Sequence, residues 1–144
     1  TDGWGGSARG GARRTERFLR RAGINPRPLT ITDGSGLSRK NLITPRALRT
    51  LLVHMDAHAA RDAFLASLPR GGERNTTLRG RLAQTEVQAK TGSLSFVRAL
   101  SGYVTQADGT RMAFVLFANN YTGPSYQVTR TMDTIVRLLG ARPS

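Results

Sequence analysis

The first part of the chain places its apolar residues at helical spacing. Residues 7 to 22 read as a helix that turns its arginines outward and keeps a modest apolar side. Thr44 followed by Pro45 predicts the start of a second helix, because threonine caps helices and proline suits their first position. The buried stripe of this helix is expected to be Leu48, Leu51, Leu52 and Met55. Between the two helices, the sequence predicts a short strand over residues 28 to 32 and then a glycine- and serine-rich loop.

From about residue 86 the pattern changes to that of β-strands. Three neighbouring strands are predicted, over residues 86–94, 96–106 and 110–120. Asp108-Gly109 between the last two predicts an antiparallel hairpin. Residues 112–118 are apolar on both faces, so helices are expected to cover both sides of the sheet. A closing helix opens at Pro124, and its buried stripe is expected to be Val128, Met132, Ile135, Val136 and Leu139. This order of elements predicts an α+β fold, an antiparallel sheet flanked by helices.

The composition fits a chain that builds a hydrophobic core. Of the 144 residues, 38% are hydrophobic, and no run of about 18 apolar residues is present. The lack of cysteine excludes disulfides, thiolate catalysis and cysteine-ligated metals. The sequence opens on Thr1-Asp2-Gly3 rather than on methionine, and we interpret residues 1–144 as a segment from inside a longer protein.

The net charge of +13 favours contact with a polyanion such as nucleic acid, anionic lipid or an acidic cell-wall polymer. The 22 basic residues comprise two lysines, Lys40 and Lys90, and twenty arginines. Such a bias also arises from the nucleotide composition of a coding sequence. Nucleic-acid readers interleave aromatic with basic residues, whereas aromatic residues here are 6% of the chain and lie mostly in apolar runs. We therefore do not expect nucleic acid as a partner.

One of the two lysines lies in the first predicted strand, in the sequence Lys90-Thr91-Gly92. An ammonium group there presents a fixed positive charge to a docked ligand, and the neighbouring hydroxyl can bind a carboxylate or relay a proton. The glycine allows close approach to the backbone, and a strand edge offers N–H and C=O groups to an extended peptide. Taken alone, a lysine on an edge strand more commonly only protects against aggregation. A functional role for these residues is therefore supported only by the segments around them.

That context is an ordered set of short segments. They are DGSGLSR at 33–39, TLRGRL at 77–82, AKTGSL at 89–94, ALSGYV at 99–104 and DGTRMAFVLFANN at 108–120. Followed by a closing helix, they resemble the C-terminal part of the class C low-molecular-mass penicillin-binding proteins, the serine D-Ala-D-Ala carboxypeptidase/endopeptidase family. The resemblance covers roughly residues 10 to 140. It implies the C-terminal part of a penicillin-binding, transpeptidase-like (serine β-lactamase-like) domain in an exported protein of the cell envelope.

The resemblance also implies roles for particular residues. Lys90, Thr91 and Gly92 match the third signature motif of such enzymes, whose lysine holds the substrate carboxylate and tunes proton transfer. Thr91 and Ser93 would flank the terminal carboxylate of the substrate, and the backbone N–H of Ser93 would form half of an oxyanion hole. Substrate binding is expected at Ser93, Leu94 and Ser95 and, in the upstream loop, at Ser35, Leu37 and Arg39. A guanidinium such as that of Arg39 suits a free carboxylate on the stem peptide, because it can bind both oxygens.

Two further motifs of that family are missing from this sequence. A Ser-x-x-Lys nucleophile motif would need serine at the positions of Leu37 or Val87. None of the nine serines is followed two residues later by asparagine, so Ser-x-Asn is missing too. In the family both motifs precede the DGSGLSR segment, so we expect them in an N-terminal part of the same enzyme. The expected partners are that part, the D-Ala-D-Ala end of the peptidoglycan stem peptide, and β-lactam antibiotics, with no cofactor and no metal.

Other interpretations of the sequence stay open. His54 and His58 are four residues apart on the predicted helix, a spacing that zinc hydrolases use, but no third ligand is evident and a solvated helix face is favoured. The arginine-rich helix at residues 7 to 22 would suit a non-catalytic basic module that binds nucleic acid or an anionic cell-wall polymer. A degenerate penicillin-binding relative that does not cleave its ligand is a third alternative.

Overall fold

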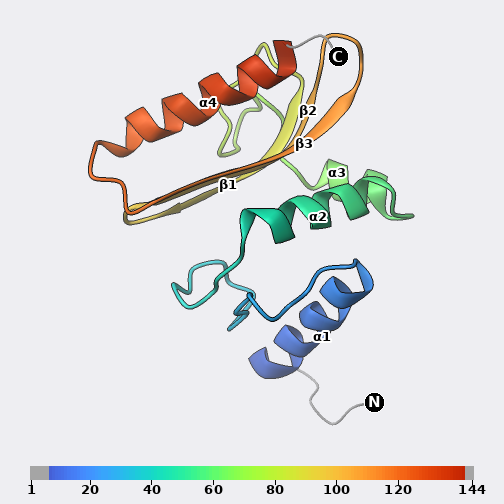
Figure 1. The fold of residues 1–144 in the computed structure, drawn as a ribbon. Helices are drawn as coiled ribbons and strands as arrows, with labels where there is room; N and C mark the ends of the chain where they lie inside the picture. Colours follow the sequence, from blue (N-terminus) through green and yellow to red (C-terminus); the bar gives the residue numbers. More distant parts are fainter. Residues whose placement is uncertain (1–6, 142–144) are drawn as a thin grey trace. The chain divides into compact units, whose positions relative to one another are not determined.

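The computed structural model describes residues 7–141, and the chain divides into two compact units, Thr1–His54 and Met55–Ser144. The first unit consists of helices and loops, and the second contains a three-stranded antiparallel sheet with helices (Figure 1). The α+β class predicted from the order of the elements is therefore confirmed.

Two helices account for most of the regular structure before residue 57. Helix α1 (Ala8–Arg21) starts where the Ser7 hydroxyl accepts a hydrogen bond from the N–H of Gly10. Helix α2 (Pro45–Asp56) starts at the predicted proline, and the Thr44 hydroxyl accepts from the N–H of Ala47 at 3.1 Å. A small core joins the end of α1 to the start of α2, with Leu19, Ala22, Ile24 and Ala47 buried.

The strand predicted over residues 28–32 is wrong. Only one pair of residues in this region bridges in a β fashion, Thr30 with Leu42. Leu42 lies between the loop 33–41 and the cap of α2, so the partner segment is too short for the pairing to continue. The bridge instead closes the base of the loop, because Thr30 and Leu42 exchange backbone hydrogen bonds of 2.9 and 2.8 Å.

The three predicted strands are present within about a residue of the expected ends. They are β1 (Val87–Leu94), β2 (Val97–Thr105) and β3 (Arg111–Asn119), in the order β1-β2-β3 and all antiparallel. β2 is central, with Ala89 opposite Gly102 and Lys90 opposite Ser101. The turn after β2 contains Gly109 in a left-handed conformation (φ 86°), as the Asp-Gly pair predicts.

Helix α4 (Ser125–Ala141) runs along one face of the sheet (Figure 1). The core on this face consists of Leu78, Leu82, Val87, Ala89, Leu100, Val104, Phe114, Met132 and Val136, all buried. The predicted stripe of α4 is wrong at Ile135, which is 37% exposed, whereas Asp133 is buried. The carboxylate of Asp133 accepts hydrogen bonds of 3.0 and 2.7 Å from the guanidinium of Arg81, and this ion pair turns the polar residue inward.

The other face is covered at the end where β1 begins. The short helix α3 (Arg61–Ala66) places the Phe64 ring edge-on to the Tyr103 ring, with centroids 6.5 Å apart. The Gln88 side chain donates to the carbonyl of Leu65 at 2.9 Å. Helices therefore pack on both faces, as expected, although on this second face Val115 and Phe117 remain half-buried.

Candidate functional site

The outer edge of β1 is occupied over only part of its length. The carbonyl of Val87 and the N–H of Ala89 bond to the segment 69–71 at 3.0 and 2.9 Å, on the side away from β2. In an antiparallel ladder alternate residues point both backbone groups to the same side, so those of Thr91 and Ser93 point to this outer edge too. Within residues 7–141, the structure records no backbone partner for these groups. The edge is thus closed up to Ala89 and open at Thr91 and Ser93.

The ammonium group of Lys90 reaches this open edge. The side chain is exposed, and its Nζ donates to the outward carbonyl of Thr91 at 2.8 Å. Its Cβ lies on the same face of β1 as that of Gln88, because side chains two residues apart share a face. A positive charge therefore lies beside an edge that has no partner strand at Thr91 and Ser93 in residues 7–141, which suits the carboxylate end of an extended peptide.

The hydroxyl groups of Thr91 and Ser93 lie on the opposite face of β1 from the Lys90 side chain. Thr91 Oγ1 donates to the hydroxyl of Thr77 at 2.8 Å, and Ser93 is exposed. Leu94 is half-buried and Ser95 is exposed in the turn that follows. Sequence reasoning assigned no role to Thr77. Its only signal was its place in the TLRGRL segment, which the resemblance included.

Two glycines set how closely the backbone packs around the site. A Cβ added to Gly92 would lie 3.1 Å from the Ala99 side chain on β2. A Cβ added to Gly102 would lie 2.1 Å from the carbonyl oxygen of Gln88 and 2.6 Å from the Cα of Ala89. The spacing of β1 from β2 at Lys90 therefore depends on the absence of these side chains.

The loop 33–41, in the first unit, contains the other predicted site residues. The Asp33 carboxylate accepts from the N–H and the hydroxyl of Ser35 at 3.0 and 2.8 Å, and the Ser35 hydroxyl accepts from the N–H of Leu37 at 3.1 Å. The hydroxyl of Ser35, then its N–H, and then the amide of Asn41 lower the pKa of Asp33 from its usual 3.8. Ser35 thus shapes the loop, while the side chains of Leu37 (71% exposed) and Arg39 are presented to solvent.

A cavity of about 250 Å³ lies at the start of β1, and none of the predicted site residues lines it. Its walls include Arg70, Glu86, Tyr103 and Arg111. Burial, followed by the negative charge of Asp56, raises the pKa of Tyr103 to about 12. Within the second unit, Arg111 pairs with Asp56 at 2.8 Å.

His54 and His58, whose spacing would allow them to share a helix face, are not on one helix. Helix α2 ends at Asp56, so His58 lies beyond it, and its Nδ1 accepts the N–H of Ala60 at 3.0 Å. The His54 ring packs edge-on to Phe18, with centroids 5.9 Å apart. Across residues 7–141, the structure places no three histidine or acidic side chains where they could share a metal ion. In the same part of the chain, no helix has the length and apolar character needed to cross a membrane.

An antiparallel sheet with a C-terminal helix across one face is an arrangement shared by the penicillin-binding and β-lactamase-like class of domains, and solved structures of that class match this chain. The fold superposes on penicillin-binding protein 4 (DacB) of Haemophilus influenzae in complex with a β-lactam, with a TM-score of 0.82, 29% identity, and coverage of 94% of this chain and 34% of that one. A β-lactamase from Chitinophaga pinensis shares the fold, with a TM-score of 0.74, 22% identity, and coverage of 91% of this chain and 55% of that one.

The chain belongs to the D-Ala-D-Ala carboxypeptidase 3 (S13) family, whose model matches residues 3–141. It is 37% identical over 118 residues to a D-alanyl-D-alanine carboxypeptidase of Actinomadura sp. (strain R39), covering 76% of this chain and 22% of that protein. It is 36% identical over 110 residues to D-alanyl-D-alanine carboxypeptidase DacB of Haemophilus influenzae, covering 73% of this chain and 23% of that protein. The resemblance noted from the sequence is confirmed. The chain spans about a quarter of the length of these relatives.

Proposed function

We propose that this chain is the C-terminal part of a serine D-Ala-D-Ala carboxypeptidase/endopeptidase that acts on peptidoglycan stem peptides and is acylated by β-lactams. The observation that carries the proposal is the open edge at Thr91 and Ser93, with the Lys90 ammonium beside it. Membership of the S13 family and the similarity to a β-lactam complex support it. The substrate lies in the cell wall, so we place the full protein outside the cytoplasmic membrane.

In this proposal the substrate lies along β1 as an added strand. Lys90 and the hydroxyls of Thr91 and Ser93 hold the terminal carboxylate, while Gly92 keeps the strand free of a side chain. A serine from the remainder of the protein attacks the carbonyl between the two D-alanines, and the N–H of Ser93 stabilises the oxyanion. The terminal D-alanine leaves, and water releases the acyl group from the serine. The chain alone is then inactive, because it holds no Ser-x-x-Lys or Ser-x-Asn motif.

Leu94 and Ser95 next to Ser93, and residues of the loop 33–41 in the first unit, are expected to contribute to binding. Leu94 and Ser95 continue the substrate edge beyond the oxyanion donor. From the loop 33–41, Leu37 offers an exposed apolar side chain and Arg39 offers a guanidinium for a carboxylate of the stem peptide. Ser35 supports this loop through its bonds to Asp33 and Leu37.

Removal of the Lys90 ammonium tests the proposal. In the full-length protein that carries this chain, Lys90→Met should slow acylation by fluorescent penicillin roughly 10²-fold, because the ligand carboxylate loses a charge-assisted partner worth about 3 kcal/mol. Lys40→Met removes the other lysine and should label at the wild-type rate. Failure of the wild-type protein to label would contradict the activity, and labelling of Lys90→Met at the wild-type rate would contradict the site.

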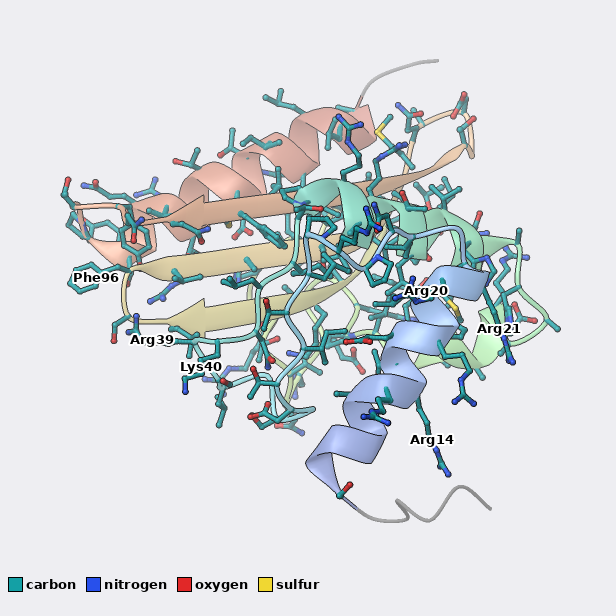
Figure 2. The ribbon with its side chains drawn as sticks, turned by 60° about the horizontal axis from the view of Figure 1, so that its bottom comes forward. Arg14, Arg20, Arg21, Arg39, Lys40 and Phe96 are labelled. Carbon is teal, nitrogen blue, oxygen red and sulfur yellow. The ribbon has the colours of Figure 1, made fainter. Side chains whose placement is uncertain are left out.

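A second function, attraction to an anionic polymer, is supported by helix α1. Arg14, Arg20 and Arg21 are exposed, and Figure 2 shows their side chains projecting from the helix. We propose that this surface draws the protein to an acidic wall polymer rather than to nucleic acid. Sedimentation with purified wall polymer at increasing salt should show affinity falling steeply for the wild type and less steeply for Arg14→Gln. An equal salt dependence in the two proteins would argue against this role.

A further inference from the structure

The hydroxyl group of Thr91 has a partner that the proposed chemistry does not use. Its Oγ1 donates to the hydroxyl of Thr77 at 2.8 Å, and Thr77 lies 14 residues earlier in the chain, in the loop before β1. Thr91 is half-buried and Thr77 is exposed. Among residues 7–141, the structure records no other hydrogen bond for either of these side chains. The two hydroxyls therefore form an isolated pair that solvent can reach.

The backbone at Thr77 is held by the residues on both sides of it. Leu78 is fully buried in the core that the sheet forms with α4, and its N–H donates to the Thr76 hydroxyl at 3.2 Å. The Thr76 hydroxyl donates in turn to the carbonyl of Glu73 at 2.9 Å. A buried side chain on one side and a bonded side chain on the other fix this part of the loop. The Thr77 hydroxyl is therefore a partner of fixed position for Thr91.

A partner at a fixed position selects one orientation of the Thr91 side chain. The staggered rotamers of a threonine exchange its hydroxyl group with its methyl group or its hydrogen. Rotation away from the observed rotamer would break the bond to Thr77 and would put an apolar group where the hydroxyl stood. One neutral hydrogen bond changes the ratio of two such populations roughly 5-fold. Thr77 thus keeps a hydroxyl, rather than a methyl group, at this place beside the edge of β1.

The direction of this hydrogen bond can reverse without a change in the positions of the oxygens. A threonine hydroxyl is both a donor and an acceptor, and its hydrogen turns about the C–O bond. When a ligand carboxylate accepts the hydrogen of Thr91, the hydrogen of Thr77 can turn toward the Thr91 oxygen, because within residues 7–141 no other acceptor is recorded for it. Each oxygen keeps its own hydrogen. The pair then forms a chain in which the bond from Thr77 strengthens the bond from Thr91 to the ligand.

We propose that Thr77 is a positioning residue for the hydroxyl of Thr91. This inference rests on the proposed peptidase function, in which the Thr91 hydroxyl binds the terminal carboxylate of the substrate. Thr77 fixes the rotamer of Thr91 before a ligand binds, and it donates to the Thr91 oxygen once the ligand is bound. Loss of the Thr77 hydroxyl should slow acylation roughly 5-fold, the contribution of one neutral hydrogen bond.

Acylation of the full-length protein by fluorescent penicillin tests this role, because penicillin carries a carboxylate for Thr91 to bind. Thr77→Val removes the hydroxyl at nearly constant shape and should lower the rate roughly 5-fold, whereas Thr77→Ser keeps the hydroxyl and should restore the rate. In a protein that already carries Thr91→Val, Thr77→Val should cause no further loss, because the partner through which it acts is missing. Thr110→Val is the matched control. It removes an exposed hydroxyl that donates to the Asp108 carboxylate at 2.9 Å and should leave the rate unchanged.

A second measurement separates the role of Thr77 from the activity of the enzyme. In full-length protein with isotope-labelled threonine methyl groups, three-bond NMR couplings report the χ1 angle of Thr91. We expect one rotamer in the wild type and in Thr77→Ser, and an average over rotamers in Thr77→Val.

The possible outcomes distinguish the positioning role from the proposed function. Thr77→Val that acylates at the wild-type rate, or that retains a single Thr91 rotamer, overturns the positioning role. An equal loss of rate in the Thr91→Val protein overturns it as well, because Thr77 would then act independently of Thr91. A wild-type protein that does not label with penicillin overturns the peptidase proposal itself, and the couplings then decide whether Thr77 fixes Thr91.

Discussion

Substitution of Gly102 tests how the candidate substrate edge is held in place. Gly102 lies on β2 opposite Ala89, where an added Cβ would stand 2.1 Å from the Gln88 carbonyl oxygen and 2.6 Å from the Ala89 Cα. Non-bonded heavy atoms prefer separations of about 3.5 Å. Gly102→Ala must therefore push β1 away from β2 by about 1 Å, because the obstructing atoms belong to the backbone and cannot rotate aside.

Both stability and reactivity should respond. Overpacking costs typically about 1–3 kcal/mol, and we expect the upper end of this range because no flexible side chain yields. A displacement of about 1 Å at a reacting site costs roughly 10²-fold in rate, and the Thr91–Ser93 edge moves with β1. Urea denaturation of the full-length protein measures the first effect, and the rate of acylation by fluorescent penicillin measures the second.

Gly11 provides the control. A Cβ there meets nothing within 4 Å, and the residue lies inside α1, so Gly11→Ala should raise stability by about 0.5–1 kcal/mol and leave acylation unchanged. If Gly102→Ala unfolds at the wild-type urea concentration and acylates at the wild-type rate, the close approach of β1 and β2 does not position the edge.

Three further predictions concern ionisable groups. Arg81→Met should lower the free energy of unfolding by about 3 kcal/mol, because it leaves the buried Asp133 carboxylate unpaired. Replacing Arg81 by Met and Asp133 by Leu together should recover most of this loss. Urea denaturation that shows no difference among the three proteins would contradict the prediction. The pKa of Asp33 is lowered from 3.8, so the ionised carboxylate contributes fully to loop stability above pH 3.8, and this contribution is lost as pH falls through the lowered pKa. The NMR shift of the Ser35 amide should follow this titration in the wild type and should not change with pH in Asp33→Asn. The pKa of Tyr103 is raised to about 12, against about 10 in an unfolded chain. The neutral Tyr103 side chain therefore contributes fully to the free energy of unfolding below about pH 10, and this contribution is lost as pH rises toward about 12. An ultraviolet titration of the folded protein in which all tyrosines ionise near pH 10 would refute the burial.

Local chemistry was sufficient to predict the features whose partners are near in sequence. Thr44 and Pro45 start α2, because the capping threonine and the first helical residue both interact within a single turn of the helix. Asp108-Gly109 forms the β2–β3 turn, where Asp108 accepts the N–H of Thr110 at 2.8 Å. In such cases the interaction that fixes the structure spans a few residues and can be read directly from the sequence.

The features that sequence reasoning missed depend on distant partners. Ile135 was expected in the core because it is apolar, but Arg81, 52 residues before Asp133, draws the acidic residue inward and rotates the helix stripe. Thr77 lies 14 residues before Thr91 in the chain, and its contact with the Thr91 hydroxyl forms only because the loop before β1 folds back to this strand. Periodicity along one segment contains no information about a partner in another.

The direction of the Ser93 N–H illustrates why the motif alone does not determine the site. A slip of one residue in the pairing of β1 with β2 would turn the Ser93 N–H toward β2 and would turn the backbone groups of the adjacent residues toward the outer edge. The register is held by Gly102 against Ala89, and the segment 69–71 ends its pairing with the outer edge at Ala89. Had that segment continued by two residues, it would occupy the backbone groups of Thr91 and leave no place for a substrate strand. The position of the candidate site therefore depends on where the loop before β1 stops pairing as much as on the presence of Lys90.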